Sequence, residues 1–436
     1  MYAVWGSLIW FLGLASAALV MMASRTWGVD SQQVIGHLTN ESGLVRWGDR
    51  GFTGLALGLG MIGVLFSLHF AQGRLPTAGL GLWLGAMALA LTSLLSSGFG
   101  AQPDLQPALL GLPITLTAVY LLPPVPLEWF VRQAKRVLLL FAYGSLLAAV
   151  VAPQWAVEYP YTEGLIPGFD VRLHGLGSHA NLLAPLLGSY LILNWFPLFR
   201  TRWHTFHQVV VLLAVILTQS KTVWILLVLA YLIRLVFAAW RLSGPLRYAA
   251  LALLATILTG GILYLASELA WLENIGVLLG QQNITTFTGR TTIWRVTLNL
   301  WEQNPWFGYG PTLWDSRMGL NYAPIVGSPP PHAHSQFYQS LGETGIVGVV
   351  GLFLYAVSLL VYGGRFARVT NGVALSLVVV MLLRGFSEPP FEGNPGSSNF
   401  YVHFLTFAFL MLVSKRNELM RFYSNVSVDR QLSSKT

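Results

Sequence analysis

The sequence predicts an all-α protein that crosses a membrane many times, with about twelve transmembrane helices and one large polar loop that contains short helices. Composition is the first observation behind this prediction, because 54% of the residues are hydrophobic and only 10% are charged, with a mean hydropathy of +0.60. Soluble domains carry about a quarter charged residues, so an ordinary soluble globule is excluded. The second observation is the length of the apolar runs, most of which lie near the roughly 20 residues that a hydrocarbon core of about 30 Å requires.

The predicted spans follow one another along the chain with polar breaks between them. They divide it into nine spans within 1–268, a polar loop at 269–344, three further spans within 345–414 and a tail at 415–436. The first run has no basic residue before it and is long enough to cross, so we expect a span rather than a cleavable signal. The twelve runs cover residues 5–24, 51–71, 77–98, 108–123, 137–153, 179–198, 206–219, 222–240, 249–268, 345–362, 372–388 and 399–414.

The apolar stretch 206–240 is interrupted by four polar residues: Thr218, Gln219, Ser220 and Lys221. The stretch is too long for one straight span and short for two. Backbone polar groups must be satisfied inside lipid, so a turn at this interruption has to be covered by protein or face water.

Charge predicts the orientation of the chain. With both termini placed in the cytoplasm, the inner segments hold 15 Lys and Arg against three acids, and the other fourteen acids fall on the opposite side. This asymmetry follows the positive-inside rule and places the 269–344 loop outside the cytoplasm. The net charge of +8 therefore reports membrane topology, and we expect no nucleic-acid partner.

A few basic residues stand on the predicted outer side, and each has a distinctive setting. Any one of them could be an interfacial residue that reaches the headgroups. Four cations on one face with an acidic balance instead favour an anionic partner such as a phosphate, because isolated charges at membrane depth usually have one. They are Arg172 in RLHGLGSHAN, Lys221 in TQSKT, Arg290 in TGRTTIW and Arg384 in RGFSEPPFEGN.

The large loop contains an amphipathic run, TTIWRVTLNLWEQNP, directly after Arg290. Its apolar residues recur at helical spacing, and Pro305 follows its end. A helix that starts here presents free N–H groups and a positive dipole to an anion, with Arg290 beside them. Its tryptophans could seat the helix at the lipid headgroups or stack on a sugar.

Two histidines, His332 and His334, follow a run of three prolines near the end of the loop. They could be structural, hydrogen-bonded residues, or they could bind a metal, although the sequence offers no evident third ligand and no cysteine. A neutral imidazole near pH 7 can instead accept a hydroxyl proton, which makes a general base the sharper hypothesis. Glu343 is the candidate partner that would orient the base.

Four blocks in this order resemble the O-antigen ligase and O-antigen polymerase superfamily of bacterial polysaccharide assembly. They span roughly residues 172 to 350 and read RLHGLGSHANLLAPLL, TQSKTVWILLVLA, TGRTTIWRVTLNLWEQNPWFGYG and AHSQFYQSLGETGIVGVVG. Two positions depart from the usual pattern. Lys221 stands where arginine is common, so we expect a single point contact with phosphate in place of a bidentate one. Ser335 follows the histidine where asparagine is common, so the family pattern does not predict how His334 is oriented.

The resemblance implies a glycosyltransferase with the C-type membrane architecture and no metal or other cofactor. Its expected donor is a glycan on undecaprenyl diphosphate, and its expected acceptor is the lipid A-core oligosaccharide at the periplasmic face of the bacterial inner membrane. By the matching positions, His334 would be the base, and Arg290, Arg172 and Lys221 would hold the diphosphate as it leaves. His332, Arg384 and Glu343 are secondary site candidates.

Several activities remain open at this point. The superfamily includes ligation to lipid A-core, polymerisation of repeat units and transfer to protein. We favour ligation over polymerisation because one outer loop dominates the others, and the short basic tail makes the protein-directed reaction less expected. A flippase for lipid-linked oligosaccharides is a further alternative, but it should carry charge at mid-membrane depth in related halves, a pattern the sequence does not show.

Overall fold

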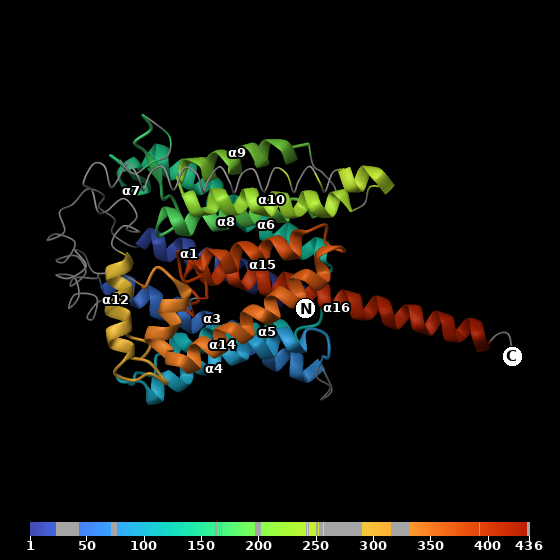
Figure 1. The fold of residues 1–436 in the computed structure, drawn as a ribbon, viewed down its shortest axis with the longest axis horizontal. Helices are drawn as coiled ribbons and strands as arrows, with labels where there is room; N and C mark the ends of the chain where they lie inside the picture. The colour runs from blue at the N-terminus through green and yellow to red at the C-terminus, as the bar shows by residue number, and fades with distance from the viewer. Residues whose placement is uncertain are drawn as a thin grey trace.

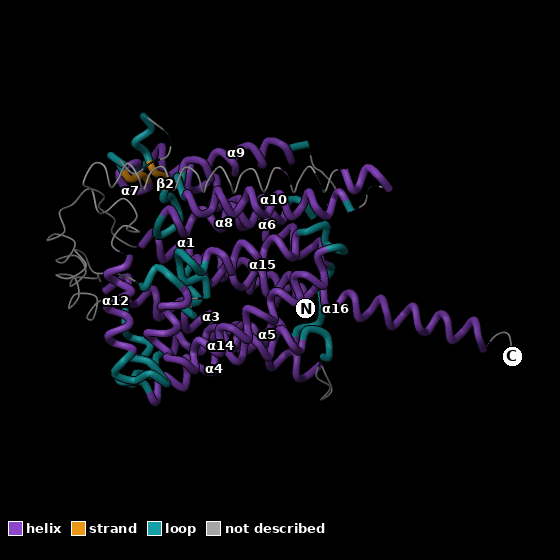
Figure 2. Tube along the Cα trace, in the orientation of Figure 1, coloured by secondary structure: helices purple, strands orange, loops and turns teal. Residues whose placement is uncertain are grey.

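The computed structural model is a bundle of helices with one very small sheet (Figures 1 and 2). It describes residues 1–22, 43–70, 76–161, 164, 166, 168–196, 202–240, 242, 244–249, 252, 256, 290–314, 332–391 and 393–433. The first half of the bundle comprises α1 (Tyr2–Met22), α3 (Gly43–Phe70), α4 (Leu80–Phe99), the 3-10 helix η1 (Pro107–Leu110), α5 (Gly111–Leu121), α6 (Leu127–Val151) and α7 (Pro153–Ala156). The second half comprises α8 (Ala180–Leu193), α9 (His204–Leu217), α10 (Lys221–Ala239), α12 (Arg290–Trp301), α14 (Gln336–Ala367), α15 (Val373–Arg384) and α16 (Ser398–Ser433).

The apolar pattern of the helices fits a membrane bundle. Among the described residues, six helices are long and apolar enough to cross a membrane, and four shorter apolar helices accompany them. The predicted all-α membrane fold is thereby confirmed. Eleven of the twelve predicted runs coincide with a helix, but the run 249–268 lies almost wholly outside the described residues, so the number of spans stays a prediction.

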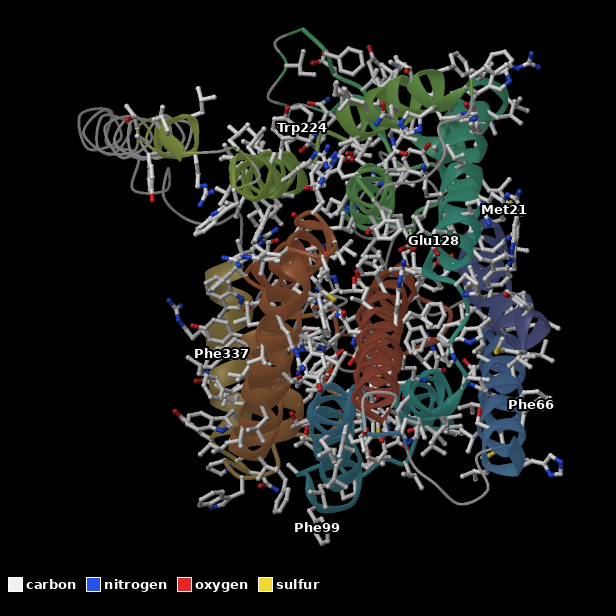
Figure 3. The ribbon with its side chains drawn as sticks, turned by 90° about the vertical axis from the view of Figure 1, so that its right-hand side faces the viewer. Met21, Phe66, Phe99, Glu128, Trp224 and Phe337 are labelled. Carbon is white, nitrogen blue, oxygen red and sulfur yellow. The ribbon has the colours of Figure 1, made fainter. Side chains whose placement is uncertain are left out.

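Helix α16 forms the centre of the bundle. A view along the bundle shows it surrounded by the other helices (Figure 3). It packs against α1, α5, α6, α8, α14 and α15, and nearly every side chain from Phe400 to Val413 is buried. This explains why its sequence is apolar all round rather than on one stripe, as expected of a helix that has no lipid-facing side.

The two ends of the bundle differ. Helix α12 and the small sheet, orange in Figure 2, lie at one end, and both termini lie at the other (Figures 1 and 2). This arrangement fits the predicted orientation, in which the termini share one side and the polar loop faces the other.

The polar interruption between α9 and α10 is a buried turn. Gln219 adopts a left-handed backbone with φ 48°, and residues 218–220 are almost fully buried. The Gln219 side-chain amide donates hydrogen bonds to the backbone oxygens of Phe169 and Val171, at 3.0 and 2.7 Å. The turn is therefore covered by protein, as the hydrogen-bonding requirement inside a bilayer demands.

Helix α14 is broken at Gly345, the residue at which we predicted that a span begins. Gly345 has φ 65° and ψ −159°, a conformation that glycine adopts without steric cost. A Cβ atom there would meet the backbone oxygen of Trp306 at 2.4 Å. The segment that follows α12 fills the break, because Ile346 and Val347 donate their N–H groups to Pro305 and Trp306. Residues 336–344 thus form a separate helical segment in front of the longer one.

Candidate functional site

The candidate site lies at the end of the bundle that carries α12. Four helices begin there, at Ala180, Lys221, Arg290 and Gln336. A hydrogen bond joins two of these beginnings, since the Ser220 hydroxyl before α10 donates to Asn181 of α8, and Gln336 donates its backbone N–H to Gly385 at the end of α15. The N-terminal end of a helix carries a partial positive charge and unpaired N–H groups, so several such ends in one place favour an anion.

Asn181 is the residue that joins the parts of this site. Its side-chain oxygen accepts from Arg172 at 3.1 Å and from the Ser220 hydroxyl at 3.0 Å. Its side-chain nitrogen donates to Glu388 at 3.0 Å, and its backbone oxygen accepts from Arg384 at 2.9 Å. One side chain therefore connects residues that lie more than 200 positions apart in the sequence.

Arg172 is held by several partners. It lies in strand β2 (Arg172–Leu173), directly opposite Glu158 of strand β1 (Val157–Glu158), and the two side chains are 3.7 Å apart. Its Nε donates to the backbone oxygen of Thr218 at 3.2 Å, and its guanidinium lies 4.6 Å from the centre of the Tyr161 ring. Two of its five N–H groups are used by these hydrogen bonds to Thr218 and Asn181.

Two histidines of the RLHGLGSHAN block contact the partners of Arg172. His174 is fully buried and 2.9 Å from Glu158. Burial opposes ionisation of Glu158, but the hydrogen bond and charge of His174 together with Arg172 lower the pKa of that carboxyl below its usual value. His179 precedes α8, and its Nδ1 accepts the Asn181 N–H at 3.2 Å. Burial, helped by the charges of His174 and Arg172, lowers the pKa of His179 to about 3, which keeps this cap neutral.

Glu388 is the carboxylate that holds the two histidines of the loop. Its Oε2 lies 3.3 Å from Nε2 of His332 and 3.6 Å from Nδ1 of His334. Burial alone would raise the pKa of Glu388, but His334, His332 and the permanently charged Arg384 lower it well below its ordinary value. Glu388 is therefore an anion at neutral pH, placed between the histidines and Asn181.

The contacts of His332 define its tautomer. Its Nδ1 accepts the backbone N–H of His334 at 3.1 Å, so its proton sits on Nε2, which faces Glu388. Burial, with a contribution from the charge of Arg290, lowers the pKa of His332 to about 4, although Glu388 opposes this. Both ring nitrogens of His332 are thus engaged, and the ring is neutral at physiological pH.

His334 is arranged differently. Its side chain is 27% exposed, and its Nδ1 is the nitrogen that faces Glu388, which leaves Nε2 for another molecule. Its backbone has φ 49°, a left-handed conformation that is uncommon for a residue with a Cβ atom and is enriched at functional sites. A carboxylate 3.6 Å from Nδ1 and a partly exposed imidazole ring are features that a general base requires.

Helix α12 supports the segment that carries the histidines. The Trp294 indole donates to the backbone oxygen of Ala333 at 2.9 Å and stacks on Tyr338 with ring centres 4.7 Å apart. Gln339 accepts the Ala333 N–H at 2.7 Å from the other side. Trp294 therefore fixes the peptide between the two histidines, and the headgroup and sugar roles considered for the loop tryptophans stay predictions.

The structure brings together most of the predicted site residues. Arg172, Arg384, His332 and His334 meet around Asn181 and Glu388. Arg290 begins α12 and acts electrostatically on His332. Lys221 begins α10 beside the buried Ser220, with its own side chain exposed. Glu343, the expected partner of the base, accepts a hydrogen bond from Gln339 at 2.6 Å, whereas the carboxylate found against both histidines is Glu388.

Five site residues were not predicted from the sequence: Glu158, His174, His179, Asn181 and Glu388. Three of them lie in the RLHGLGSHAN block, of which only Arg172 was a predicted site residue. Glu388 follows Arg384 by four residues, in the RGFSEPPFEGN block. Its role depends on the fold, which places the end of α15 against a segment more than 50 residues earlier.

His332, His334 and Glu388 also fit a metal ion by type and distance. Each offers one ligand atom, and the three atoms lie within 4.8 Å of one another. Two imidazoles and a carboxylate are a ligand set that divalent zinc accepts. Glu388 therefore supplies the third ligand that the sequence did not reveal, and the expectation of metal-free chemistry stays a prediction.

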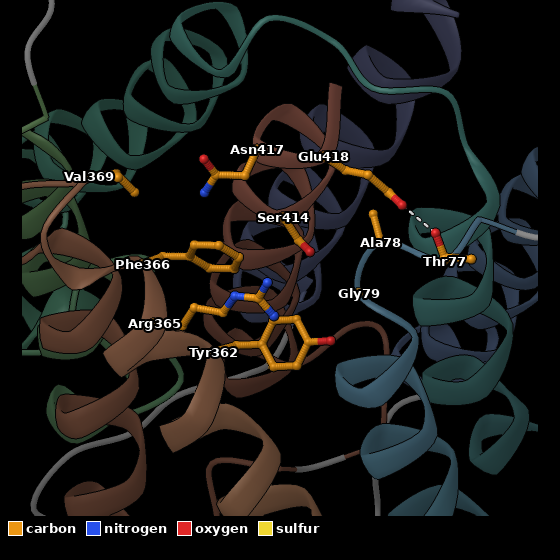
Figure 4. A pocket seen from close by; sticks show the side chains of 10 residues that line it. All are labelled: Thr77, Ala78, Gly79, Tyr362, Arg365, Phe366, Val369, Ser414, Asn417 and Glu418. Carbon is orange, nitrogen blue, oxygen red and sulfur yellow. Dashed lines mark hydrogen bonds between the residues drawn. The ribbon is translucent and has the colours of Figure 1, made fainter. Parts of the chain in front are cut away.

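A different hollow lies at the opposite end of the bundle. Figure 4 shows it between α14, α16 and the segment before α4, with a volume of about 350 Å³. Arg365 and Glu418 bring one charge of each sign to its rim, and Thr77 forms a hydrogen bond with Glu418. The part of its lining that the structure describes has one cation, Arg365, and no histidine, so these residues lack the features of the candidate site.

The fold and the site together define a polytopic all-α membrane protein with a cation-rich polar site at one end of the bundle. Residues 208–353, about a third of the chain, match the family described as O-antigen ligase. This match confirms the resemblance to the O-antigen ligase and polymerase superfamily drawn from the motif blocks. None of the curated proteins matches the chain.

The matched region runs from α9 into α14. It includes Lys221, Arg290, His332 and His334, whereas Arg172, Asn181, Arg384 and Glu388 lie on either side of it. The three-dimensional site therefore joins residues inside the matched region to residues beyond both of its ends.

Proposed function

We propose that this protein is an O-antigen ligase that transfers a glycan from undecaprenyl diphosphate to lipid A-core oligosaccharide. The site would face the periplasm of a bacterial inner membrane, with both termini in the cytoplasm. The family match supports a glycosyltransferase of the ligase or polymerase kind, and the choice of ligation rests on the single dominant outer loop.

One observation carries the proposal: His334 lies against Glu388 in the same polar cluster that holds Arg172 and Arg384. A base for a hydroxyl group and cations for a leaving diphosphate are the two functions that this transfer needs. The four converging helix beginnings add positive potential at the same place. The cluster thus supports both halves of the reaction.

The proposed reaction is a single displacement. The acceptor hydroxyl oxygen forms a bond to the anomeric carbon while the bond from that carbon to the diphosphate oxygen breaks. Nε2 of His334 takes the hydroxyl proton, and Glu388 at Nδ1 stabilises the imidazolium that forms. Attack from the side opposite the leaving group inverts the anomeric configuration.

The cations have distinct parts in this proposal. Arg290 and Lys221 stand at helix beginnings with partly or fully exposed side chains, so they are placed to contact the diphosphate. The side chain of Arg172 is more enclosed, and its guanidinium adds positive charge to the same polar cluster. Arg384 is only 2% exposed and binds the Asn181 backbone, so we assign it to positioning the start of α8. Fixed cations in a water-poor site stabilise developing charge more than mobile ones in water.

The test is transfer by the purified protein in nanodiscs, which have no ion gradient. The protein is mixed with glycan-bearing undecaprenyl diphosphate and lipid A-core, and the products are analysed by mass spectrometry. Ligation predicts glycan joined to lipid A-core with release of undecaprenyl diphosphate. Longer glycan on the donor lipid would instead support the polymerase alternative. If neither product forms, while the same protein in vesicles moves the donor lipid across the bilayer, the protein is a flippase and the proposal is wrong.

A further inference from the structure

A cavity with a polar wall and an apolar wall adjoins His332. It has a volume of about 340 Å³ and lies between α4, η1, the first segment of α14 and residues 389–394. His332 belongs both to its wall and to the candidate site. Its size falls within the range of about 300–1,000 Å³ that is typical of small-molecule sites.

One face of α14 supplies a polar wall. Residues spaced three and four apart share a side of a helix, and the residues of α14 that line the cavity all carry polar side chains. Polar side chains in a membrane bundle face the protein interior, water or a ligand. The lining residues on this face are Gln336, Gln339, Ser340, Glu343 and Thr344.

Hydrogen bonds fix the orientation of these side chains. Gln336 donates to Ser340 at 3.1 Å and accepts the Phe391 N–H at 3.0 Å. Gln339 accepts the Ala333 N–H and donates to Glu343 at 2.6 Å. The wall therefore presents amide, hydroxyl and carboxylate groups in set positions, which lowers the cost of ordering them around a ligand.

Trp314 provides an independent observation. Its side chain lines the cavity, it is only 6% exposed, and its indole N–H has no hydrogen-bond acceptor among the residues that the structure describes. A buried N–H group usually has a partner, so this one points to a ligand acceptor. An indole offers an apolar face together with a polar N–H, which matches the apolar face and the hydroxyl groups of a sugar ring.

The charge of the cavity distinguishes it from the cationic cluster. Among the described residues, none that lines the cavity is Lys or Arg, and Glu343 adds a carboxylate. A diphosphate is therefore disfavoured here, whereas the hydroxyl groups of an uncharged sugar suit the amides and the carboxylate.

We propose that this cavity binds the acceptor sugar, an inference that rests on the proposed glycosyl transfer. In a single displacement, the acceptor oxygen and the leaving diphosphate lie on opposite sides of the anomeric carbon. The cations gather around Asn181, whereas the cavity is lined by His332, whose ring centre lies 4.2 Å from that of His334. An acceptor in the cavity therefore brings its hydroxyl group to the histidine pair, in a region lined by other residues than those that hold the cations.

The test measures acceptor binding separately from transfer. The probe is core oligosaccharide released from its lipid, titrated into protein in nanodiscs by calorimetry, with donor-lipid binding measured in parallel. Trp314→Phe removes only the N–H, Glu343→Gln removes only the charge, and Ser93→Phe fills the cavity from α4. Arg365→Ala, in the hollow of similar volume at the opposite end, is the matched control.

We expect each cavity variant to raise the acceptor Kd and acceptor KM by about 10-fold, the effect of losing roughly one hydrogen bond. The donor Kd should stay as in the wild type, as should kcat for Trp314→Phe and Glu343→Gln at saturating acceptor. The Arg365→Ala protein should match the wild type in every measurement. Since the three substitutions come from different walls, misfolding of one variant leaves the other two to decide.

Two results would overturn the inference. Unchanged acceptor binding in all correctly folded cavity variants would exclude the cavity as the acceptor site, and weakened donor binding would assign it to the donor glycan instead. Both outcomes are distinct from failure of the proposed function, which would show as no transfer of glycan to lipid A-core by the wild-type protein in nanodiscs. If Arg172→Ala and His334→Ala transfer glycan normally, the assignment of the reaction to the cationic cluster and His334 is wrong, whatever the cavity variants do.

Discussion

The two ends of the bundle use their basic residues in different ways. At the end with the termini, Lys415 donates to the backbone oxygens of Val119 and Leu122, at 3.2 and 2.6 Å, where α5 ends. Lys135 similarly contacts the side chain of Asn194, the residue after α8. Cations at the carbonyl ends of helices are stabilised by the helix dipole, so these lysines already have hydrogen-bond acceptors and a favourable dipole within the protein.

At the α12 end, Lys221 and Arg290 are themselves the first residues of their helices. The helix dipole there is positive and opposes their charge. Arg172 donates one hydrogen bond to the backbone oxygen at the end of α9. It donates a second to the side chain of Asn181, in the first turn of α8. The position of a cation relative to the helix ends therefore separates two groups. Lys415 and Lys135 stabilise the fold, whereas Lys221 and Arg290 are the cations that we propose bind an anion.

The first prediction concerns which side of the membrane each end of the bundle faces: the α12 end the periplasm, and the end with the termini the cytoplasm. The chain has no cysteine, so a single introduced cysteine reports its own location. We expect an impermeant maleimide, added to cells with a permeable outer membrane, to label Glu302→Cys and to leave Arg416→Cys unlabelled until the inner membrane is opened. The reverse pattern would place the site in the cytoplasm and contradict the mechanism.

The second prediction compares cations of the two ends. Arg290→Ala and Arg172→Ala should each reduce turnover on the order of 100-fold, as when one donor to a transition state is removed. Lys221→Ala should cost less because an ammonium makes a point contact, and Lys221→Arg should be tolerated. Initial rates of transfer, normalised to the amount of inserted protein, give the measurement.

The matched control for these substitutions is Arg416→Ala. Arg416 forms an exposed ion pair with Glu128 at 2.8 Å at the end with the termini. Exposed pairs contribute little, so turnover should match the wild type. An Arg290→Ala enzyme as active as this control would show that Arg290 only anchors the loop.

A smaller effect is expected from Glu388→Gln. The amide keeps the size of the side chain and the contact with Asn181, but it removes the charge that orients His334 and stabilises its protonated form. A reduction of kcat by about 10- to 100-fold is expected, the range for partners that orient a functional histidine. The acceptor KM should change little. A larger effect on the acceptor KM than on kcat would assign Glu388 to substrate binding.

The smallest expected effect is that of a chelator. If the basic residues supply the electrostatic stabilisation, exhaustive treatment with EDTA should leave the transfer rate unchanged. The geometry makes this a sharp test, because His332, His334 and Glu388 could hold a divalent ion. Activity that is lost in EDTA and restored by zinc or manganese would make the histidines ligands and exclude His334 as the base.

The sequence predicted the all-α membrane fold because hydrophobic length depends on local composition alone. It also singled out Arg172, Arg384, His332 and His334, which carry unusual polarity in apolar surroundings and meet in the structure. It could not select Glu388 over Glu343 as the carboxylate beside the histidines. Both are acids near helix ends, and only packing of the end of α15 against the loop separates them.

The break in α14 shows a similar limit. The start of the apolar run at residue 345 predicted where the long segment begins, but not that residues 336–344 would already be helical. That extra segment depends on hydrogen bonds from the chain after α12, which pairs with the break at Gly345. Its polar face is also the wall of the cavity beside His332, so a tertiary contact creates a surface that local pattern alone does not reveal.

The most direct test of the account compares donor binding with turnover in two histidine variants. A base contributes roughly 10²–10⁴-fold, so His334→Ala should lose turnover by that factor while it binds donor lipid as tightly as the wild type. His332→Ala should lose much less, because both nitrogens of His332 are engaged within the protein. The opposite ranking, with His332→Ala the inactive protein, would contradict the assignment of the base. Full activity in both variants would contradict histidine catalysis at this site altogether.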